Sequence, residues 1–212
     1  MNPRSTHIVV LPGGGYSVHA PHEAEPVADW LRSLGLDASV FRYPLETRHP
    51  APTDAVLSEV KRLRDAGASK VALLGFSAGG HAAGLAALQA ASGVDAAILC
   101  YPVVSMQLET HAGSRNNLIG TSPSPELREA TSVDCLVTRS APPMFVWHTA
   151  ADEVVPVDHS YLLGRALARE GVAHELHVFP TGEHGIGLAS GHGAAEVWPS
   201  LVENWLRELG WI

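Results

Sequence analysis

Short apolar runs alternate with amphipathic stretches along almost the whole chain, and this alternation is the feature that most restricts its fold. We predict strands at 7–11, 38–43, 70–75, 96–101, 144–148 and 175–179, and helices at 27–34, 53–65, 78–91, 158–170 and 194–209. Parallel strands joined by helices of this length require right-handed crossovers. The pattern therefore predicts an α/β fold with a mostly parallel sheet that is covered by helices on both faces.

Residues 103–142 break this alternation. The segment contains several prolines and serines and shows only weak periodicity. A stretch of this length without regular structure is usually functional when it lies inside a compact domain. A length of 212 residues suits one domain. We therefore expect a single domain over residues 1–212, with 103–142 as a cap or substrate loop over the active site.

The composition limits the partners that the chain can have. Its net charge is −8 and only two residues are lysine, so a cationic track for nucleic acid is not expected. Four apolar residues precede Pro12, too few for a signal-peptide core or a membrane span, which predicts a cytoplasmic location without a membrane partner. Cys100 and Cys135 lack metal-site spacing and are expected to be reduced, partly buried thiols. The oligomeric state is left open.

A candidate nucleophile lies in the sequence Gly75-Phe76-Ser77-Ala78-Gly79. It fits the GxSxG pattern, in which a serine occupies a sharp turn between a strand and a helix. The predicted strand before it and the small-residue helix after it supply the context that this pattern needs. The turn exposes the Ser77 hydroxyl at a helix N-terminus, where the N–H of Ala78 can donate to a developing oxyanion.

A serine hydroxyl needs a base, and the base needs an orienting carboxylate. Asp152 and His184 each follow a predicted strand, in the order Ser, Asp, His that is typical of this pattern. Both lie in loops at strand ends, where open α/β sheets bind their ligands. Glu153 and Asp158 are alternatives for the acid, although Asp158 also suits the cap of the following helix.

The glycine-rich loop after the first strand is the candidate for the remaining oxyanion donors. We expect the amides of Gly14 and Gly15 to donate, with the amide of Tyr16 as an alternative to either. Binding of a phosphate is disfavoured because the third glycine of a GxGxxG motif is replaced by Val18.

His19 and His22, three residues apart, follow this glycine loop closely. The sequence places no third ligand within their reach, so we expect solvated or substrate-facing side chains rather than a metal site.

With these residues assigned, the chain resembles the α/β-hydrolase superfamily. Within it, the similarity is to the small carbohydrate-esterase-like branch with acetylxylan esterases, feruloyl esterases and dienelactone-type hydrolases. The resemblance spans almost the whole chain and rests on LPGGGY, HEAEPVADWL, RYP with HPAPTDA, GFSAGGHAA, HAGSRNNLIG, HTAADEVVPV and FPTGEHGIGL. It implies a three-layer α/β-hydrolase sandwich with Ser77 as nucleophile, Asp152 as acid and His184 as base. Because the first strand already leads into the glycine loop, the two antiparallel strands that begin larger hydrolases are not expected, and the sheet should have about six strands.

The expected function is hydrolysis of short-chain acyl esters, acetyl esters of sugars among them, through an acyl-enzyme. Its partner is a small-molecule ester, and neither a metal nor an organic cofactor is needed. A peptidase or amidase on the same fold is an alternative because it shares the three side chains. A binding protein that has kept the shell and lost the chemistry is a second alternative, since one fold hosts many functions.

Overall fold

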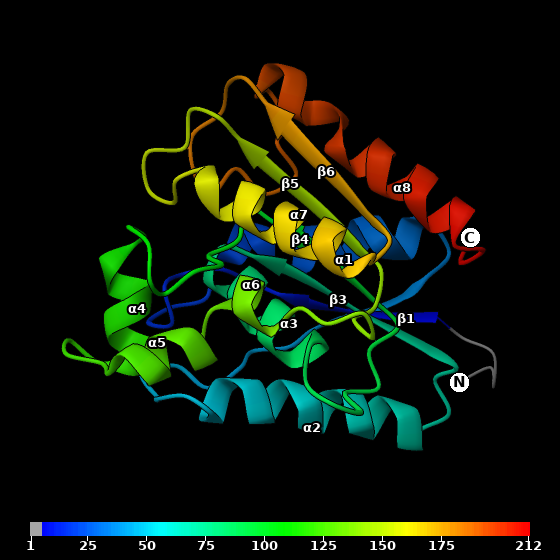
Figure 1. Cartoon of the computed structure of the whole chain (residues 1–212). Helices are drawn as coiled ribbons and strands as arrows, with labels where there is room; N and C mark the ends of the chain where they lie inside the picture. The colour runs from blue at the N-terminus through cyan, green and yellow to red at the C-terminus, as the bar shows by residue number, and fades with distance from the viewer. Residues whose placement is uncertain (1–5) are drawn as a thin grey trace.

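The structure is a computed structural model that describes residues 6–212. Six strands form one sheet in the order β2-β1-β3-β4-β5-β6 (Figure 1). They are β1 (Thr6–Leu11), β2 (Asp37–Val40), β3 (Lys70–Phe76), β4 (Ala96–Cys100), β5 (Met144–Thr149) and β6 (His174–Phe179). Every neighbouring pair is parallel. The predicted α/β fold with a parallel sheet of about six strands is thereby confirmed.

The strand order reverses next to β1. The chain passes from β1 to β2 on one side and then returns to β3 on the other side of β1. Open α/β sheets bind ligands outside the carboxyl ends of the strands at such a reversal. The loops that follow β1 and β3 are therefore favoured positions for a site.

Helices cover both faces of the sheet. Two separate apolar clusters form the core, one on each face. Helices α2 (Ala51–Asp65), α3 (Ala78–Ala87) and α7 (Asp158–Glu170) contribute to one cluster, and α1 (Glu25–Ser33) and α8 (Trp198–Glu208) to the other. Alternate residues of β1 enter opposite clusters, as the pleat of a strand requires. The result is the three-layer sandwich expected from the sequence.

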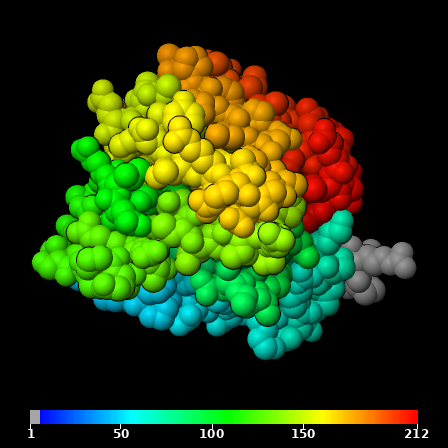
Figure 2. All heavy atoms as spheres, in the orientation of Figure 1, coloured from blue at the N-terminus to red at the C-terminus, as the bar shows by residue number. Residues whose placement is uncertain are grey.

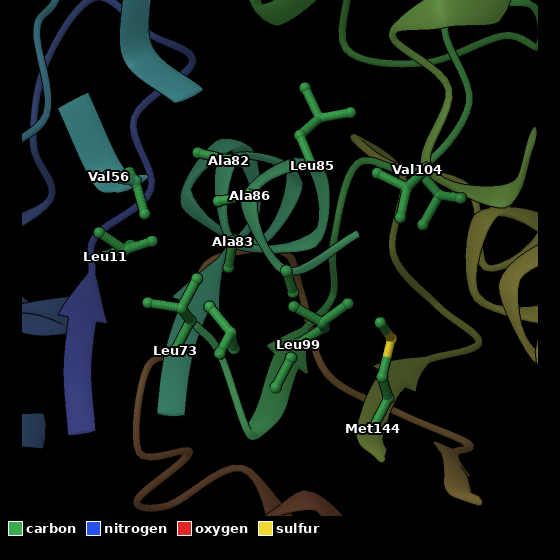
Figure 3. Close-up of a cluster of buried hydrophobic side chains, with 14 of the residues drawn as sticks. Leu11, Val56, Leu73, Ala82, Ala83, Leu85, Ala86, Leu99, Val104 and Met144 are labelled. Atoms are coloured by element: carbon green, nitrogen blue, oxygen red, sulfur yellow. The ribbon is translucent and has the colours of Figure 1, made fainter. Parts of the chain in front are cut away.

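Helix α3 lies unusually close to the sheet because its residues are small. Figure 3 shows the side chain of Ala83 directed toward Leu73 and Leu99 on the sheet. A Cβ atom added to Gly79 would lie 2.1 Å from the carbonyl oxygen of Leu11. Only glycine at this position allows the helix to begin directly on the strand.

Some elements differ in length from the prediction. Strand β2 ends at Val40 rather than at residue 43, and its last pair with β1 is Val10 with Val40. Helix α3 ends at Ala87 rather than at residue 91, and the last helix is split into a 3-10 turn (Gly193–Val197) and α8. Of the two thiols predicted to be partly buried, one is fully buried and the other, Cys135, is exposed.

The segment 103–142 contains three short helices, α4 (Ala112–Ile119), α5 (Pro125–Ala130) and α6 (Val133–Leu136). Helices α4 and α5 lie beyond the carboxyl ends of the strands (Figure 1), and the segment projects beside α7 (Figure 2). Buried histidines fasten it to the core. Nδ1 of His159 in α7 accepts the N–H of Val104 at 2.8 Å, and Nε2 of His81 donates to the carbonyl of Thr131 at 2.8 Å. Within residues 6–212, no helix combines the length and the apolar character that crossing a membrane requires.

Candidate active site

Ser77 occupies the sharp turn between β3 and α3. Its backbone lies at φ 51° and ψ −116°, a conformation that a residue with a Cβ atom rarely adopts. The turn is crowded on both sides, since a Cβ atom on Gly75 would lie 2.3 Å from the carbonyl oxygen of Gly79. The carbonyl of Ser77 accepts the N–H of His81, which closes the first turn of α3. The strained turn therefore aims the Ser77 side chain above the sheet at a helix N-terminus.

Two further side chains meet Ser77 above the same edge of the sheet. Nε2 of His184 lies 2.8 Å from Oγ of Ser77, and Nδ1 of His184 lies 2.6 Å from Oδ2 of Asp152. A carboxylate only accepts, so Nδ1 carries the proton that it donates, and Nε2 is left to accept from the serine hydroxyl. The alternative acids lie elsewhere: Glu153 is exposed, and Asp158 begins α7.

The carboxylate of Asp152 is held by four donors. Its Oδ1 accepts the N–H groups of Val154 and Val155, both at 2.9 Å, and Oδ2 also lies 3.2 Å from Nε2 of His148. Burial raises the pKa of Asp152, but the hydrogen bonds from His148 and His184 outweigh it and hold the pKa below its ordinary value. Asp152 therefore stays ionised next to His184. Sequence reasoning missed the role of His148, which is fully buried in β5.

A second buried carboxylate, Glu23, joins the glycine loop to the wall behind His184. Its Oε2 accepts the N–H of Gly13 at 2.8 Å, and its Oε1 accepts the hydroxyl of Tyr101 at 2.7 Å. The Tyr101 ring packs edge-on against the imidazole of His184, with ring centroids 5.0 Å apart. The Tyr101 oxygen also accepts the N–H of Gly187, beyond His184 in the chain. Glu23 was not identified from the sequence, where it reads as an ordinary acidic residue before a helix.

The glycine loop has a left-handed backbone at three successive residues. The φ angles are 120° at Gly14, 65° at Gly15 and 62° at Tyr16. Glycine adopts such angles freely, whereas Tyr16 does so only under constraint. That constraint is a buried hydrogen bond of 2.7 Å from the Tyr16 hydroxyl to Nδ1 of His81. The burial that surrounds His81 lowers its pKa to about 4, which keeps Nδ1 free to accept.

A cavity of about 330 Å³ opens above the serine. Its lining includes Gly14, Gly15, Ser77, His111, Val154 and His184. This volume lies at the small end of the range for ligand sites. His22 also lines the cavity, and its Nε2 donates to the carbonyl of Gly185 at 2.7 Å. Among residues 6–212, no three histidine, cysteine or acidic side chains come together as metal ligands. A larger hollow of about 580 Å³ lies at the far end of α3, away from Ser77.

Comparisons with known proteins agree with this fold. The acetyl ester-xyloside bifunctional hydrolase from Caldicellulosiruptor lactoaceticus superposes with a TM-score of 0.95 at 37% identity, covering 100% of this chain and 86% of that one. Endo-1,4-beta-xylanase B from Butyrivibrio fibrisolvens is 31% identical over 86% of this chain and 33% of its own length. An acetylxylan esterase from Xylanibacter ruminicola is 28% identical over 98% of this chain and 46% of its own. The chain thus spans a third to about half the length of these last two relatives.

The sheet and these likenesses define an enzyme with the α/β-hydrolase fold, and they confirm the predicted class, a carboxylic ester hydrolase. The model of the prolyl oligopeptidase family matches residues 54–208. The chain belongs to this family. The resemblance to carbohydrate-esterase-like hydrolases that the sequence motifs indicated is likewise confirmed.

Proposed function

We propose that the chain is a serine esterase that hydrolyses short-chain acyl esters, acetyl esters of sugars among them, through an acyl-enzyme on Ser77. The observation that carries this proposal is the continuous hydrogen-bond chain from Ser77 through His184 to Asp152, with distances of 2.8 and 2.6 Å. Such a chain is the arrangement that activates a serine hydroxyl at neutral pH.

In the first half of the reaction, Oγ of Ser77 attacks the ester carbonyl carbon while Nε2 of His184 takes the hydroxyl proton. The ionised carboxylate of Asp152 stabilises the imidazolium that forms. Negative charge develops on the carbonyl oxygen and is met by the backbone N–H groups of Gly14, Gly15 and Ala78. The N–H of Tyr16 remains an alternative to either glycine amide.

In the second half, the tetrahedral intermediate collapses and the bond to the alcohol oxygen breaks. Nε2 of His184 gives its proton to that oxygen, and the acyl group stays on Ser77. Water then attacks the acyl-enzyme with His184 again as the base, which releases the acid and restores the hydroxyl. Every step uses side chains and amides of this chain.

The substrate assignment is supported by the cavity and by the relatives. A cavity of about 330 Å³ suits a small ester, and a net charge of −8 favours neutral over anionic substrates. The relative from Caldicellulosiruptor lactoaceticus is named for acetyl ester and xyloside hydrolysis, and that from Xylanibacter ruminicola for acetylxylan. Acetyl esters of xylose-type sugars are therefore the first substrates to test.

The direct experiment compares the wild type with Ser77→Ala on 4-nitrophenyl acetate. We expect the substitution to reduce kcat by several orders of magnitude, because removal of the nucleophile leaves only binding and oxyanion contacts. Ser58→Ala is the matched control, since Ser58 is exposed on α2 and its hydroxyl donates to the carbonyl of Asp54. Equal turnover by Ser77→Ala and the wild type would remove the nucleophile assignment.

A peptidase or amidase is the second candidate, and the name of the prolyl oligopeptidase family is what favours it. Amide hydrolysis would use the same three side chains but has to protonate an amine leaving group. A panel of acyl esters and the matching anilides separates the two functions. A kcat/KM for anilides equal to that for esters would overturn the esterase proposal in favour of an amidase.

A further inference from the structure

The side chain of His111 reaches the cavity from the segment 103–142. It precedes α4 as the N-cap residue and lines the same cavity as Ser77 and His184. Its ring lies against the glycine loop, since a Cβ atom on Gly15 would be 3.1 Å from Cε1 of His111. The imidazole of His111 therefore lies beside the reacting groups, although the proposed reaction does not use it.

The hydrogen bonds of His111 determine which nitrogen carries its proton. Nδ1 accepts the N–H of Ser114 at 3.2 Å and lies 2.9 Å from Oγ of the same residue, so it is the capping acceptor of α4. A ring nitrogen that accepts a backbone N–H is unprotonated, and the proton of the neutral ring is therefore on Nε2. Burial, and then the nearby His184, lower the pKa of His111, which favours this neutral form.

The Nε2–H group of His111 is an unused donor in a fixed position. It forms no hydrogen bond with any of residues 6–212, and the side chain is exposed. The helix that carries it is fastened to the loop below, because Nδ2 of Asn117 donates to the carbonyl of Gly15 at 2.8 Å. A donor that is rigidly held and open to the cavity is suited to bind an acceptor on a ligand.

We propose that Nε2–H of His111 donates a hydrogen bond to a hydroxyl or ring oxygen of the substrate's alcohol moiety, and so selects polyhydroxylated alcohols such as sugars. This inference rests on the proposed function. Ser77 is almost fully buried at the floor of the cavity, whereas His111 is exposed at its wall. With a short acyl group at the serine, the part of the ester that extends from the floor toward the wall is the alcohol.

Two substitutions separate the donor from the helix cap. His111→Asn keeps an acceptor at the position of Nδ1, and asparagine is among the best N-cap residues, but it removes the donor at the position of Nε2. His111→Gln keeps an amide donor at about the reach of Nε2 and gives up the cap. His111→Ser is a second variant that keeps a cap without the distant donor. His174→Asn, at the opposite edge of the sheet where β6 begins, is the control for loss of a histidine.

The measurement is the ratio of kcat/KM for an O-acetylated methyl xyloside to kcat/KM for 4-nitrophenyl acetate, whose alcohol has no hydroxyl neighbours. We expect this ratio to fall roughly tenfold in His111→Asn and His111→Ser, the usual effect of one lost neutral hydrogen bond. It should stay within about threefold of the wild type in His111→Gln and in the control.

Three results would overturn the assignment. An unchanged ratio in both cap-preserving variants would show that the donor meets no sugar oxygen. An equal loss on both esters would place it on the carbonyl or alkoxy oxygen that they share. A ratio that falls as far in His111→Gln as in His111→Asn would show that a donor at this reach does not restore the preference, so the effect would not come from the Nε2–H hydrogen bond. Failure of the proposed function would be seen in a different comparison. The wild type and Ser77→Ala would then hydrolyse 4-nitrophenyl acetate at the same rate.

Discussion

The hydroxyl of Tyr16 lies 2.7 Å from Nδ1 of His81, and both side chains are buried. The other ring nitrogen of His81 donates to the carbonyl of Thr131, so one imidazole connects the glycine loop, α3 and the segment 103–142. Because Nε2 carries the proton that is donated to Thr131, Nδ1 can accept from Tyr16 only while the ring is neutral. Protonation of His81 would remove the acceptor of the Tyr16 hydroxyl and place a positive charge on a fully buried ring.

This arrangement makes stability depend on pH. An unfolded histidine has a pKa of about 6.5, whereas burial lowers the pKa of His81 to about 4 in the folded chain. Between these values the unfolded state binds a proton that the folded state does not, so the contribution of His81 is complete above pH 6.5 and is lost as the pH falls toward 4. The measurement is urea unfolding at pH 7.5, 6 and 4.5. Between pH 7.5 and pH 4.5, we expect the free energy of unfolding to fall by about 2 kcal/mol less in His81→Gln than in the wild type.

Each protein serves as its own reference at pH 7.5, because His81→Gln also loses the bond to Tyr16. His174→Gln, at a partly exposed position on β6, is the control and should follow the wild type. If the free energy of unfolding fell with pH by the same amount in His81→Gln and in the wild type, this would contradict a buried neutral imidazole at this position.

Asp152 is the carboxylate that contacts His184, so its conversion to an amide should disable the base. In Asp152→Asn the amide can present N–H₂ to Nδ1 of His184, which favours the wrong tautomer of the ring. We expect kcat for 4-nitrophenyl acetate to fall by roughly 10³–10⁴, as for other triad acids. Glu153→Gln and Asp158→Asn should stay within about twofold of the wild type. A large loss in either of these, with activity kept in Asp152→Asn, would identify a different acid.

Glu23→Gln tests the link between the glycine loop and the wall behind His184. Both oxygens of Glu23 accept, one from Gly13 and the other from Tyr101, so an amide must turn N–H₂ toward one of these donors. A buried donor left without its acceptor costs about 1–3 kcal/mol. We expect the free energy of unfolding to fall by that amount, with a lower kcat. Glu25→Gln, at an exposed position on α1, should change the free energy of unfolding by less than about 0.5 kcal/mol. If Glu23→Gln and Glu25→Gln changed it equally, the buried contacts of Glu23 would not be needed.

Gly79 and Gly84 lie on the same helix but face different neighbours. A Cβ atom at 79 would lie 2.1 Å from the carbonyl oxygen of Leu11, and one at 84 would lie 2.9 Å from a methyl group of Val133. The backbone carbonyl cannot move without displacing β1, whereas the valine can rotate. We expect Gly79→Ala to be at least roughly 2 kcal/mol less stable than Gly84→Ala in thermal or urea unfolding. Similar stabilities would show that α3 can shift away from the sheet.

The fold and the meeting of three side chains could be predicted because both depend on local patterns. Ser77 follows β3 directly, and Asp152 and His184 lie within a few residues of the ends of β5 and β6. Parallel strands end at one edge of a sheet, so residues that follow different strands come together there. The approach of His184 to Ser77, 107 residues away in the chain, therefore needed no more than the order of strands and helices.

The supporting residues could not be predicted in this way. Glu23 and Tyr101 are 78 residues apart, and their contact depends on how a 3-10 turn packs against the end of β4. His148 reads as one more residue of a buried strand. The helices of 103–142 have eight, six and four residues, too short for a 3.6-residue period to stand out. For that reason the position of His111 over Gly15 left no trace in the sequence pattern.

The positive φ angle of Ser77 also bears on how robust the protein can become. A conformation of this kind costs a residue with a Cβ atom on the order of 1–3 kcal/mol, which the surrounding packing has to outweigh. A glycine there would relax the backbone but would carry no hydroxyl. Thermal stability and chemical reactivity therefore make opposite demands on this position. Substitutions that stabilise the protein without loss of the hydroxyl have to lie elsewhere in the chain.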